Sequence, residues 1–289
     1  NGPFWRIELK DASGDLEARI WSPLSQQFAE IPSGVIAEVE GRAESFRDKL
    51  QVNVNALRVL SPEETASVDT SAFMASSSRP PQEMLDELEA LCRKEFTYKP
   101  WRKFILSVLE DEAIRVPLLT APAAKSVHHA FLGGLLMHTA NMVKIADFLA
   151  GMYPETIDRS LLLTGTLLHD FGKEREFAFS DLGIVTEYST AGQLLGHLVM
   201  GAQEVADAAR ELDIPEEKSM LLQHLLLSHH GEPEFGAAVR PMCAEAELLS
   251  YIDLIDSRME IYAETLPTVP AGSFSARIFA LEKKIYHHN

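Results

Sequence analysis

Seven histidine and aspartate side chains recur between residues 138 and 253 of this 289-residue chain. They are His138, His169, Asp170, His197, His229, His230 and Asp253. Imidazole nitrogens and carboxylate oxygens together suit borderline divalent metals such as Mn, Fe, Co, Ni or Zn, and one Asp can bridge two ions. Because buried His and Asp are costly unless they are paired or metal-bound, the set predicts a metal site of one ion or two.

Two neighbours of this set have other interpretations. His224 stands alone in an apolar stretch, which favours a hydrogen-bonded core residue over a ligand. Asp256, three residues after Asp253, either supports a metal ligand or caps a helix, or else it is a solvated acid or forms an ion pair with Arg258 or Arg240. The sequence leaves these alternatives for Asp256 open.

The candidate ligands need helices to hold them. From Glu83 onward apolar residues recur with helical spacing, which predicts helices near residues 127–152, 156–170, 191–211, 216–229, 242–265 and 274–286. Every candidate ligand falls on or at the end of one of the first five, and inward-facing ligands from several helices are how bundles build metal sites. Successive residues on a helix point about 100° apart, so only one ring of the His229-His230 doublet is expected to face the site.

The first 60 residues predict strands instead. Apolar and polar residues alternate over 5–10 and 16–21, then over 35–39 and 50–55, with a short helical stretch before the third strand. This rhythm resembles an OB-fold that lacks its first strand, with a helical insertion before its third remaining strand. Residues 61–82, rich in Ser and Pro, predict a linker, and residues 83–289 an all-α domain. The predicted fold class is thus multi-domain α+β.

Composition narrows the classes of protein. Two cysteines indicate neither a disulfide framework nor a thiolate site, and no apolar run is long enough to span a bilayer, so we expect a cytoplasmic protein. The net charge is −17, and residues 126–289 carry 11 Lys and Arg against 23 Asp and Glu, whereas residues 1–60 carry 7 against 9. This acidity argues against generic, salt-driven binding of nucleic acid, although it leaves room for a local basic groove.

The order of these residues resembles the HD superfamily of metal-dependent phosphohydrolases. Its pattern of a His, an adjacent His-Asp and a distal Asp is matched by His138, His169-Asp170 and Asp253. The resemblance implies one ion held by these four residues, and a second held by Asp170, His197 and His229, with His230 as the alternative to His229.

Flanking residues narrow the resemblance further. The segments 128–139, 192–197, 228–232 and 251–256, together with an OB-like region in front, resemble the YhaM family of 3′→5′ exoribonucleases. The resemblance covers nearly the whole chain and implies a phosphodiesterase that shortens single-stranded RNA, or single-stranded DNA, from its 3′ end. Two divalent ions, most simply Mn²⁺ with Fe, Co, Ni, Zn or Mg as alternatives, would activate water and neutralise phosphate charge.

Further roles follow from this interpretation. Lys173, four residues after His169, is expected to contact the scissile phosphate, and Asp170 to orient or deprotonate water besides binding metal. His128 and His129 are expected at the start of the 127–152 helix, where they either meet substrate phosphate or form a surface pair. Cations and an aromatic ring of the OB-like region, at Arg42, Phe46, Arg47 and Lys49, predict a single-strand contact, although neighbouring acids dilute it.

Three other functions remain compatible with the sequence. They are a phosphohydrolase of small nucleotides with a regulatory OB domain, a di-iron oxygenase and a nucleic-acid tether without catalysis. The oligomeric state is left open, and no membrane partner is expected.

Overall fold

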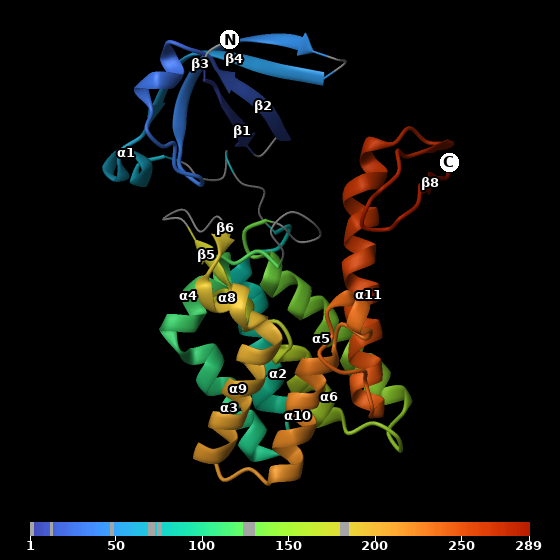
Figure 1. Ribbon diagram of the computed structural model, residues 1–289. Helices are drawn as coiled ribbons and strands as arrows, with labels where there is room; N and C mark the ends of the chain where they lie inside the picture. The colour runs from blue at the N-terminus through green and yellow to red at the C-terminus, as the bar shows by residue number, and fades with distance from the viewer. Residues whose placement is uncertain are drawn as a thin grey trace. The chain divides into compact units, whose positions relative to one another are not determined.

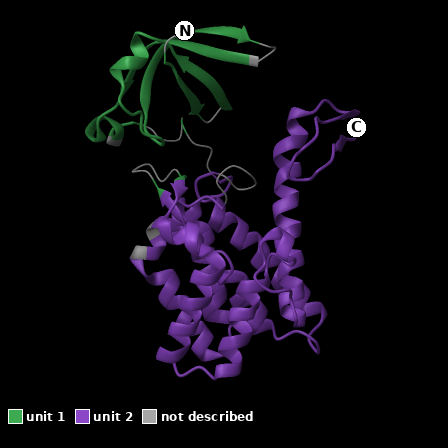
Figure 2. Ribbon diagram, viewed as in Figure 1, with its two compact units in different colours: residues 1–76, 179–186 green, residues 77–178, 187–289 purple. Residues whose placement is uncertain are grey.

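The computed structural model of the chain describes residues 3–11, 14–46, 49–68, 73, 77–123, 131–179 and 185–289. The chain divides into two compact units (Figure 2). One contains residues 1–76 with 179–186, and the other contains residues 77–178 with 187–289.

The smaller unit is built on a curved four-stranded sheet (Figure 1). Its strands are β1 (Trp5–Asp11), β2 (Gly14–Ile20), β3 (Ala37–Phe46) and β4 (Lys49–Val59), in the order β1-β2-β4-β3. The outer pairs are antiparallel, whereas β2 and β4 run parallel, and a 3-10 helix, η1 (Leu24–Gln27), follows β2. This path is that of four OB-fold strands, which confirms the predicted small β-sheet fold. Among the described residues no pairing joins β1 to β3, so barrel closure is not observed.

The alternation of residues in the sheet separates a core face from an outer face. Ala18, Ile20 and Val54 are buried on one face, against Ile7, Val52 and other apolar side chains. The residues between them point to the opposite face, as a pleated strand requires. Within the predicted linker, Ser61 caps the short helix α1 (Pro62–Ala66), and its hydroxyl accepts a hydrogen bond from the backbone N–H of Glu64.

The larger unit is a helical bundle, as predicted (Figure 1). Its helices are α2 (Pro81–Glu95), α3 (Lys99–Glu110), α4 (Glu112–Thr120), α5 (Gly134–Met152), α6 (Arg159–Leu168), α7 (Lys173–Glu176), α8 (Thr190–Leu194), α9 (Gly196–Glu211), α10 (Glu216–Ser228) and α11 (Ala244–Thr265). Helix α6 is buried from Leu161 to Leu168 and contacts α3, α5, α10 and α11. A helix that is apolar on every side belongs inside a bundle, and α6 is the central helix here.

Three predicted helices differ from the observed ones. The helix predicted over 127–152 starts only at Gly134, after Gly133 in a left-handed conformation, and His128 and His129 lie outside the described residues. The helix predicted over 191–211 is broken at Gly196, where φ is 72°. The helix predicted near 274–286 is wrong: strands β7 (Ser273–Phe274) and β8 (Tyr286–His287) pair there, and Leu281 and Ile285 pack on Ile261 of α11.

Short strands also occur elsewhere in this half of the chain. Strands β5 (Phe177–Phe179) and β6 (Val185–Tyr188) form a two-stranded sheet between α7 and α8. Their three and four residues are too few to give a period-2 signal in a sequence. In the described part of the chain, no helix combines the length and hydropathy that crossing a bilayer requires.

Candidate metal centre

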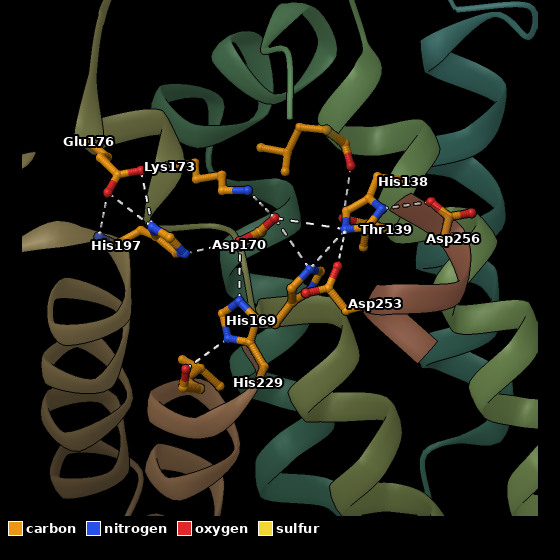
Figure 3. A network of polar contacts seen from close by, with 12 residues as sticks. His138, Thr139, His169, Asp170, Lys173, Glu176, His197, His229, Asp253 and Asp256 are labelled. Atoms are coloured by element: carbon orange, nitrogen blue, oxygen red, sulfur yellow. Dashed lines mark hydrogen bonds and ion pairs between the residues drawn. The ribbon is translucent and has the colours of Figure 1, made fainter. Parts of the chain in front are cut away.

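The structure brings the predicted metal ligands together in one cluster, most of which Figure 3 shows. His138 comes from α5 and Asp253 from α11, whereas His169 and Asp170 directly follow α6. His197 lies in the first turn of α9, and the doublet His229-His230 directly follows α10. Several of these side chains sit at helix ends, where the chain turns and can aim a ring inward. Five of the seven side chains are buried, with Asp170 2% and His138 1% exposed, whereas His230 and Asp253 are partly exposed.

Asp170 lies at the middle of the cluster, and its two carboxylate oxygens face different histidines. Oδ2 is 3.4 Å from Nε2 of His169 and 3.9 Å from Nε2 of His138. Oδ1 is 3.3 Å from Nε2 of His197 and 3.6 Å from Nε2 of His229. Nε2 of His138 also lies 3.4 Å from Oδ1 of Asp253. The two oxygens of Asp170 thus face two separate groups of potential ligand atoms, which is the geometry that a carboxylate shared by two cations would need.

Each of four histidines is held through Nδ1, which leaves Nε2 directed at the cluster. Nδ1 of His169 donates to the carbonyl of Thr166, and Nδ1 of His229 to the carbonyl of Leu226, both at 2.8 Å. A carbonyl can only accept, so Nε2 of both rings carries the lone pair that a metal needs. The other two rings are held by carboxylates. Nδ1 of His138 lies 2.7 Å from Oδ2 of Asp256, and Nδ1 of His197 lies 3.0 Å from both carboxylate oxygens of Glu176.

Four buried atoms of the cluster make no hydrogen bond within the described residues. They are Oδ1 of Asp170, Nε2 of His197, Nε2 of His229 and Nδ1 of His230. Buried polar atoms without a partner are rare, and each needs an explanation such as an ion. All four belong to the half of the cluster formed by Asp170, His197, His229 and His230, so the donor set fits a divalent cation there.

The His229-His230 doublet does not follow the helical geometry that was expected. Helix α10 ends at Ser228, and the chain turns through His229 and His230 to Gly231, where φ is 78°. The 100° rotation of a helix therefore does not apply. Both rings lie against His197, with ring centroids 5.7 Å away for His229 and 5.3 Å for His230. His197, His229 and His230 together form one group of potential ligand atoms, and His138, His169 and Asp170 form another.

The charges in the cluster shift the pKa values of its members. Burial alone would lower the pKa of His138, but Asp253 and Asp256 outweigh it and raise the pKa to about 9. Burial also opposes ionisation of Asp170, whose pKa is nevertheless held well below its usual range by Lys173 and the histidines. Burial and the neighbouring His229 lower the pKa of His230 to about 3. At neutral pH the cluster thus combines ionised carboxylates with a neutral His230.

Lys173 contacts the carboxylate of Asp170. Gly172 precedes the short helix α7, and Nζ of Lys173 lies 2.6 Å from Oδ2 of Asp170 (Figure 3). The Lys173 side chain is 14% exposed, and the carboxylate of Asp170 raises the pKa of its ammonium against the effect of burial. A Cβ on Gly172 would lie 2.8 Å from the backbone oxygen of His197, so this close packing needs glycine.

The outer face of the small sheet carries a row of cations. Cross-strand partners place Arg6 beside Arg19, Arg19 beside Asn53, and Asn53 beside Arg42. Side chains of paired residues point to the same face, so β1, β2, β4 and β3 contribute one polar row. We call Arg6, Arg19, Asn53 and Arg42 the arginine row.

Aromatic rings lie against the arginine row. The guanidinium of Arg19 lies 5.3 Å from the ring centre of Phe46 and 6.0 Å from that of Trp21, and it also pairs with Glu17 at 2.9 Å. Of the predicted nucleic-acid contacts, Arg42 and Phe46 belong to this surface. Lys49 begins β4, and Arg47 lies outside the described residues.

Comparison with known proteins agrees with this geometry. Residues 135–258, which contain all seven candidate ligands, match the family model of the HD domain. The chain is 34% identical over 287 residues to the 3′-5′ exoribonuclease YhaM of Bacillus subtilis, covering 99% of this chain and 88% of the relative. The YhaM enzymes of Oceanobacillus iheyensis and Bacillus licheniformis are each 35% identical, with 99% of this chain and 87% and 88% of the relatives covered. This chain belongs to the YhaM family. No solved structure matches it.

Sequence reasoning missed one member of the centre of this YhaM-family chain. Glu176 accepts hydrogen bonds from both Nδ1 and the backbone N–H of His197, yet nothing in the segment Lys173 to Glu176 marks it apart from an ordinary charged turn. Its burial could have been suspected only from the apolar residues of β5 that follow. Asp256, for which the sequence left several interpretations open, is buried and contacts Nδ1 of His138. The structure therefore favours a role in supporting that metal ligand. His224 accepts a hydrogen bond from the backbone of Met242, as the non-ligand interpretation predicts.

Proposed function

We propose that this chain is a metal-dependent 3′-5′ exoribonuclease that uses the His/Asp cluster to hydrolyse the terminal phosphodiester of single-stranded RNA. The observation that carries the proposal is the bridging arrangement of Asp170 between two groups of histidine Nε2 atoms. Full-length similarity to the YhaM enzymes supports the same reaction and substrate. Single-stranded DNA remains an alternative substrate to be tested beside RNA.

The residues proposed to hold two ions divide between the two carboxylate oxygens. His138, His169, Asp253 and Oδ2 of Asp170 would hold one ion, and His197, His229, His230 and Oδ1 of Asp170 the other. Bound divalent ions supply an activated water and neutralise charge on the phosphodiester oxygens. The nitrogen and oxygen donors fit Mn²⁺, which we propose as the physiological metal.

Protein groups would complete the reaction centre. Asp170 is a ligand first, because its two oxygens are directed at the two groups of histidines. Lys173, whose Nζ lies 2.6 Å from Oδ2 of Asp170, would contact the scissile phosphate as a point charge beside the cluster. Glu176 and Asp256 fix the rings of His197 and His138 and so keep Nε2 aimed inward. His129, a further predicted catalytic residue, and His128, a predicted nucleic-acid contact, lie outside the described residues.

We further propose that the arginine row contacts the RNA strand. Cations in a row attract the phosphate backbone, and the exposed rings of Trp21 and Phe46 offer stacking surfaces for bases. The chain has a net charge of −17, which repels the phosphates of RNA. The arginine row would supply a local attraction that counters this repulsion.

The deciding experiment is cleavage of a 5′-labelled single-stranded RNA in the presence of Mn²⁺. A ladder that shortens from the 3′ end supports the proposal, and Asp170→Asn should abolish it. Asp207→Asn, an exposed carboxylate on α9, is the matched control and should cleave normally. Hydrolysis of mononucleotides without cleavage of RNA or DNA would overturn the exoribonuclease proposal, and binding without any cleavage would favour a tether. Metal analysis of the purified protein tests the choice of Mn²⁺ separately.

A further inference from the structure

A cavity of about 280 Å³ opens directly beside the metal centre. His229, His230 and Asp253 form the wall that it shares with the cluster. Nε2 of His229 and Nδ1 of His230 are buried here without a hydrogen-bond partner within the described residues, so the cavity adjoins atoms that are proposed to bind metal. The volume is near the lower end of small-ligand sites, at about 300 Å³, which suits one nucleoside rather than a longer segment of strand.

Two aromatic rings stand on the cavity wall away from the metal centre. Phe235 ends the 3-10 helix η3 (Pro233–Phe235) and is 75% exposed, and Tyr251 on α11 is 53% exposed. Large rings left this open to solvent beside a candidate active site are suited to stacking on a base, whatever its identity. Leu254 and Pro241 add apolar surface to the same cavity.

The charged groups of the cavity are carboxylates. Glu232 and Glu247 line it beside Asp253, and none of its described lining residues is Lys or Arg. Arg240 pairs with Glu232 at 2.7 Å, whereas no Lys or Arg of the described residues forms an ion pair with Glu247. Glu247 raises the pKa of the neighbouring Tyr251 hydroxyl, and its carboxylate has lone pairs that can accept from a ligand. Such a wall repels phosphate, but it can accept hydrogen bonds from hydroxyl groups.

We infer that this cavity binds the 3′-terminal nucleoside of the RNA, with Phe235 and Tyr251 holding its base and Glu247 accepting hydrogen bonds from its ribose hydroxyls. The inference rests on the proposed exoribonuclease function and adds a reason why cleavage starts at an end. A strand that continued past the terminal nucleoside would bring a phosphate against Glu247 and Glu232. A free 3′-hydroxyl end fits, whereas a 3′-phosphate end or an internal segment is rejected by charge.

The kinetic test compares three 5′-labelled RNAs that differ only at the 3′ end. They end in a ribonucleoside with a free 3′-hydroxyl, in a 3′-phosphate, or in a 2′-deoxynucleoside with a free 3′-hydroxyl. For the unmodified protein we expect kcat/KM to fall at least about tenfold with the 3′-phosphate and roughly tenfold with the 2′-deoxy end. Glu247→Gln should reduce both ratios, because it removes the repulsive charge and weakens acceptance from hydroxyls.

Matched controls keep this test specific. Glu260→Gln makes the same change on α11 outside the cavity and should leave both ratios unchanged. Tyr251→Ala should raise KM for every RNA, whereas Tyr251→Phe should keep the stacking and raise KM little. Thermal unfolding of each variant checks that the protein is still folded. Equal rates on the 3′-hydroxyl and 3′-phosphate RNAs would overturn the inference while leaving the exoribonuclease proposal in place.

A second measurement does not depend on cleavage. An RNA with 4-thiouridine as its last nucleotide, irradiated on the protein, should crosslink to peptides that contain Phe235 or Tyr251. Crosslinks confined to other peptides would overturn the inference even if RNA is degraded from its 3′ end. Crosslinks to these peptides by a protein that degrades no RNA would instead overturn the proposed function and keep the nucleoside site.

Discussion

The two units of this protein use charged side chains in opposite ways. In the helical unit five of the seven candidate ligands are buried, and each of four histidines is fixed by its own Nδ1 partner. In the sheet unit the arginine row lies on the outer face of the sheet, where Arg6 and Arg42 are exposed to solvent. The energy of a buried charge depends on the individual atoms that pair with it. Exposed charges each contribute little to binding, and salt screens them. The two units should therefore respond very differently to single substitutions.

Replacement of the bridging carboxylate tests this contrast most severely. Asp170→Asn keeps the shape of the side chain but removes the charge that both groups of histidines face. We expect RNA cleavage to fall by at least about 10³-fold, because the charge stabilisation of the reaction is lost. Single-turnover cleavage measures this loss, and metal analysis should show that less metal is retained. A variant with normal metal content and near-normal cleavage would contradict the central role of Asp170.

Substitution of a residue that orients a metal ligand should reduce RNA cleavage less than substitution of Asp170. Glu176→Gln retains size but removes the carboxylate that orients His197, and such changes typically reduce metal affinity about 10- to 100-fold. Titration with Mn²⁺, followed by calorimetry or by recovery of activity, measures the affinity. Glu211→Gln, at the exposed end of α9, is the control. If saturating Mn²⁺ does not restore most of the activity of Glu176→Gln, the role of Glu176 goes beyond positioning a ligand.

The pH dependence of metal binding should reveal the proton on His138. Its pKa is raised to about 9, so the ring is largely protonated at neutral pH, and a metal must displace that proton. The apparent affinity should therefore increase as the pH rises from 7 toward 9, by at most about tenfold per pH unit for one proton. Calorimetry in buffers with different ionisation enthalpies counts the protons released. Asp256→Asn removes a partner that raises this pKa and should flatten the increase; an unchanged slope would contradict the assignment.

Substitutions in the arginine row should have the smallest effects. Arg42→Ala should weaken RNA binding a few-fold and reduce the dependence of log K on log salt by about 0.7, the contribution of one phosphate contact in a single strand. Fluorescence anisotropy at several salt concentrations measures both quantities. Arg277→Ala, an exposed cation in the other unit, should leave the slope unchanged. A loss of binding as large as the effect of Asp170→Asn would contradict the contrast between the units.

Residue types and spacing were enough to predict the main features of both units. The alternating strands predicted the small sheet, and the helical spacing of apolar residues predicted the bundle and the position of each ligand on or at the end of a helix. Residues 274–286 also have helical spacing, but they pack back on α11 as an irregular hairpin. The spacing of apolar residues cannot distinguish a helix from such a hairpin, because both structures bury the same apolar side chains.

The finer geometry of the site depends on contacts between distant residues. Glu176 reaches His197 only because Gly192 and Gly172 let the chain segments approach closely; a Cβ on Gly192 would lie 2.2 Å from the backbone oxygen of Glu176. The arginine row likewise depends on the parallel pairing of β2 with β4, which brings together residues more than 30 positions apart. Neither contact leaves a periodic signal in the sequence.

The burial of α6 has a consequence for motion. Its residues from Leu161 to Leu168 have no solvent-exposed face, so its backbone amides should be among the slowest to exchange with deuterium. His169 and Asp170 continue directly from this helix, whereas His197 follows the short elements α8 and β6. Local opening should therefore separate His197 from the cluster far more often than it moves the His169-Asp170 pair. We expect ligand exchange at the centre to begin on the His197 side, which hydrogen exchange resolved by peptide can test.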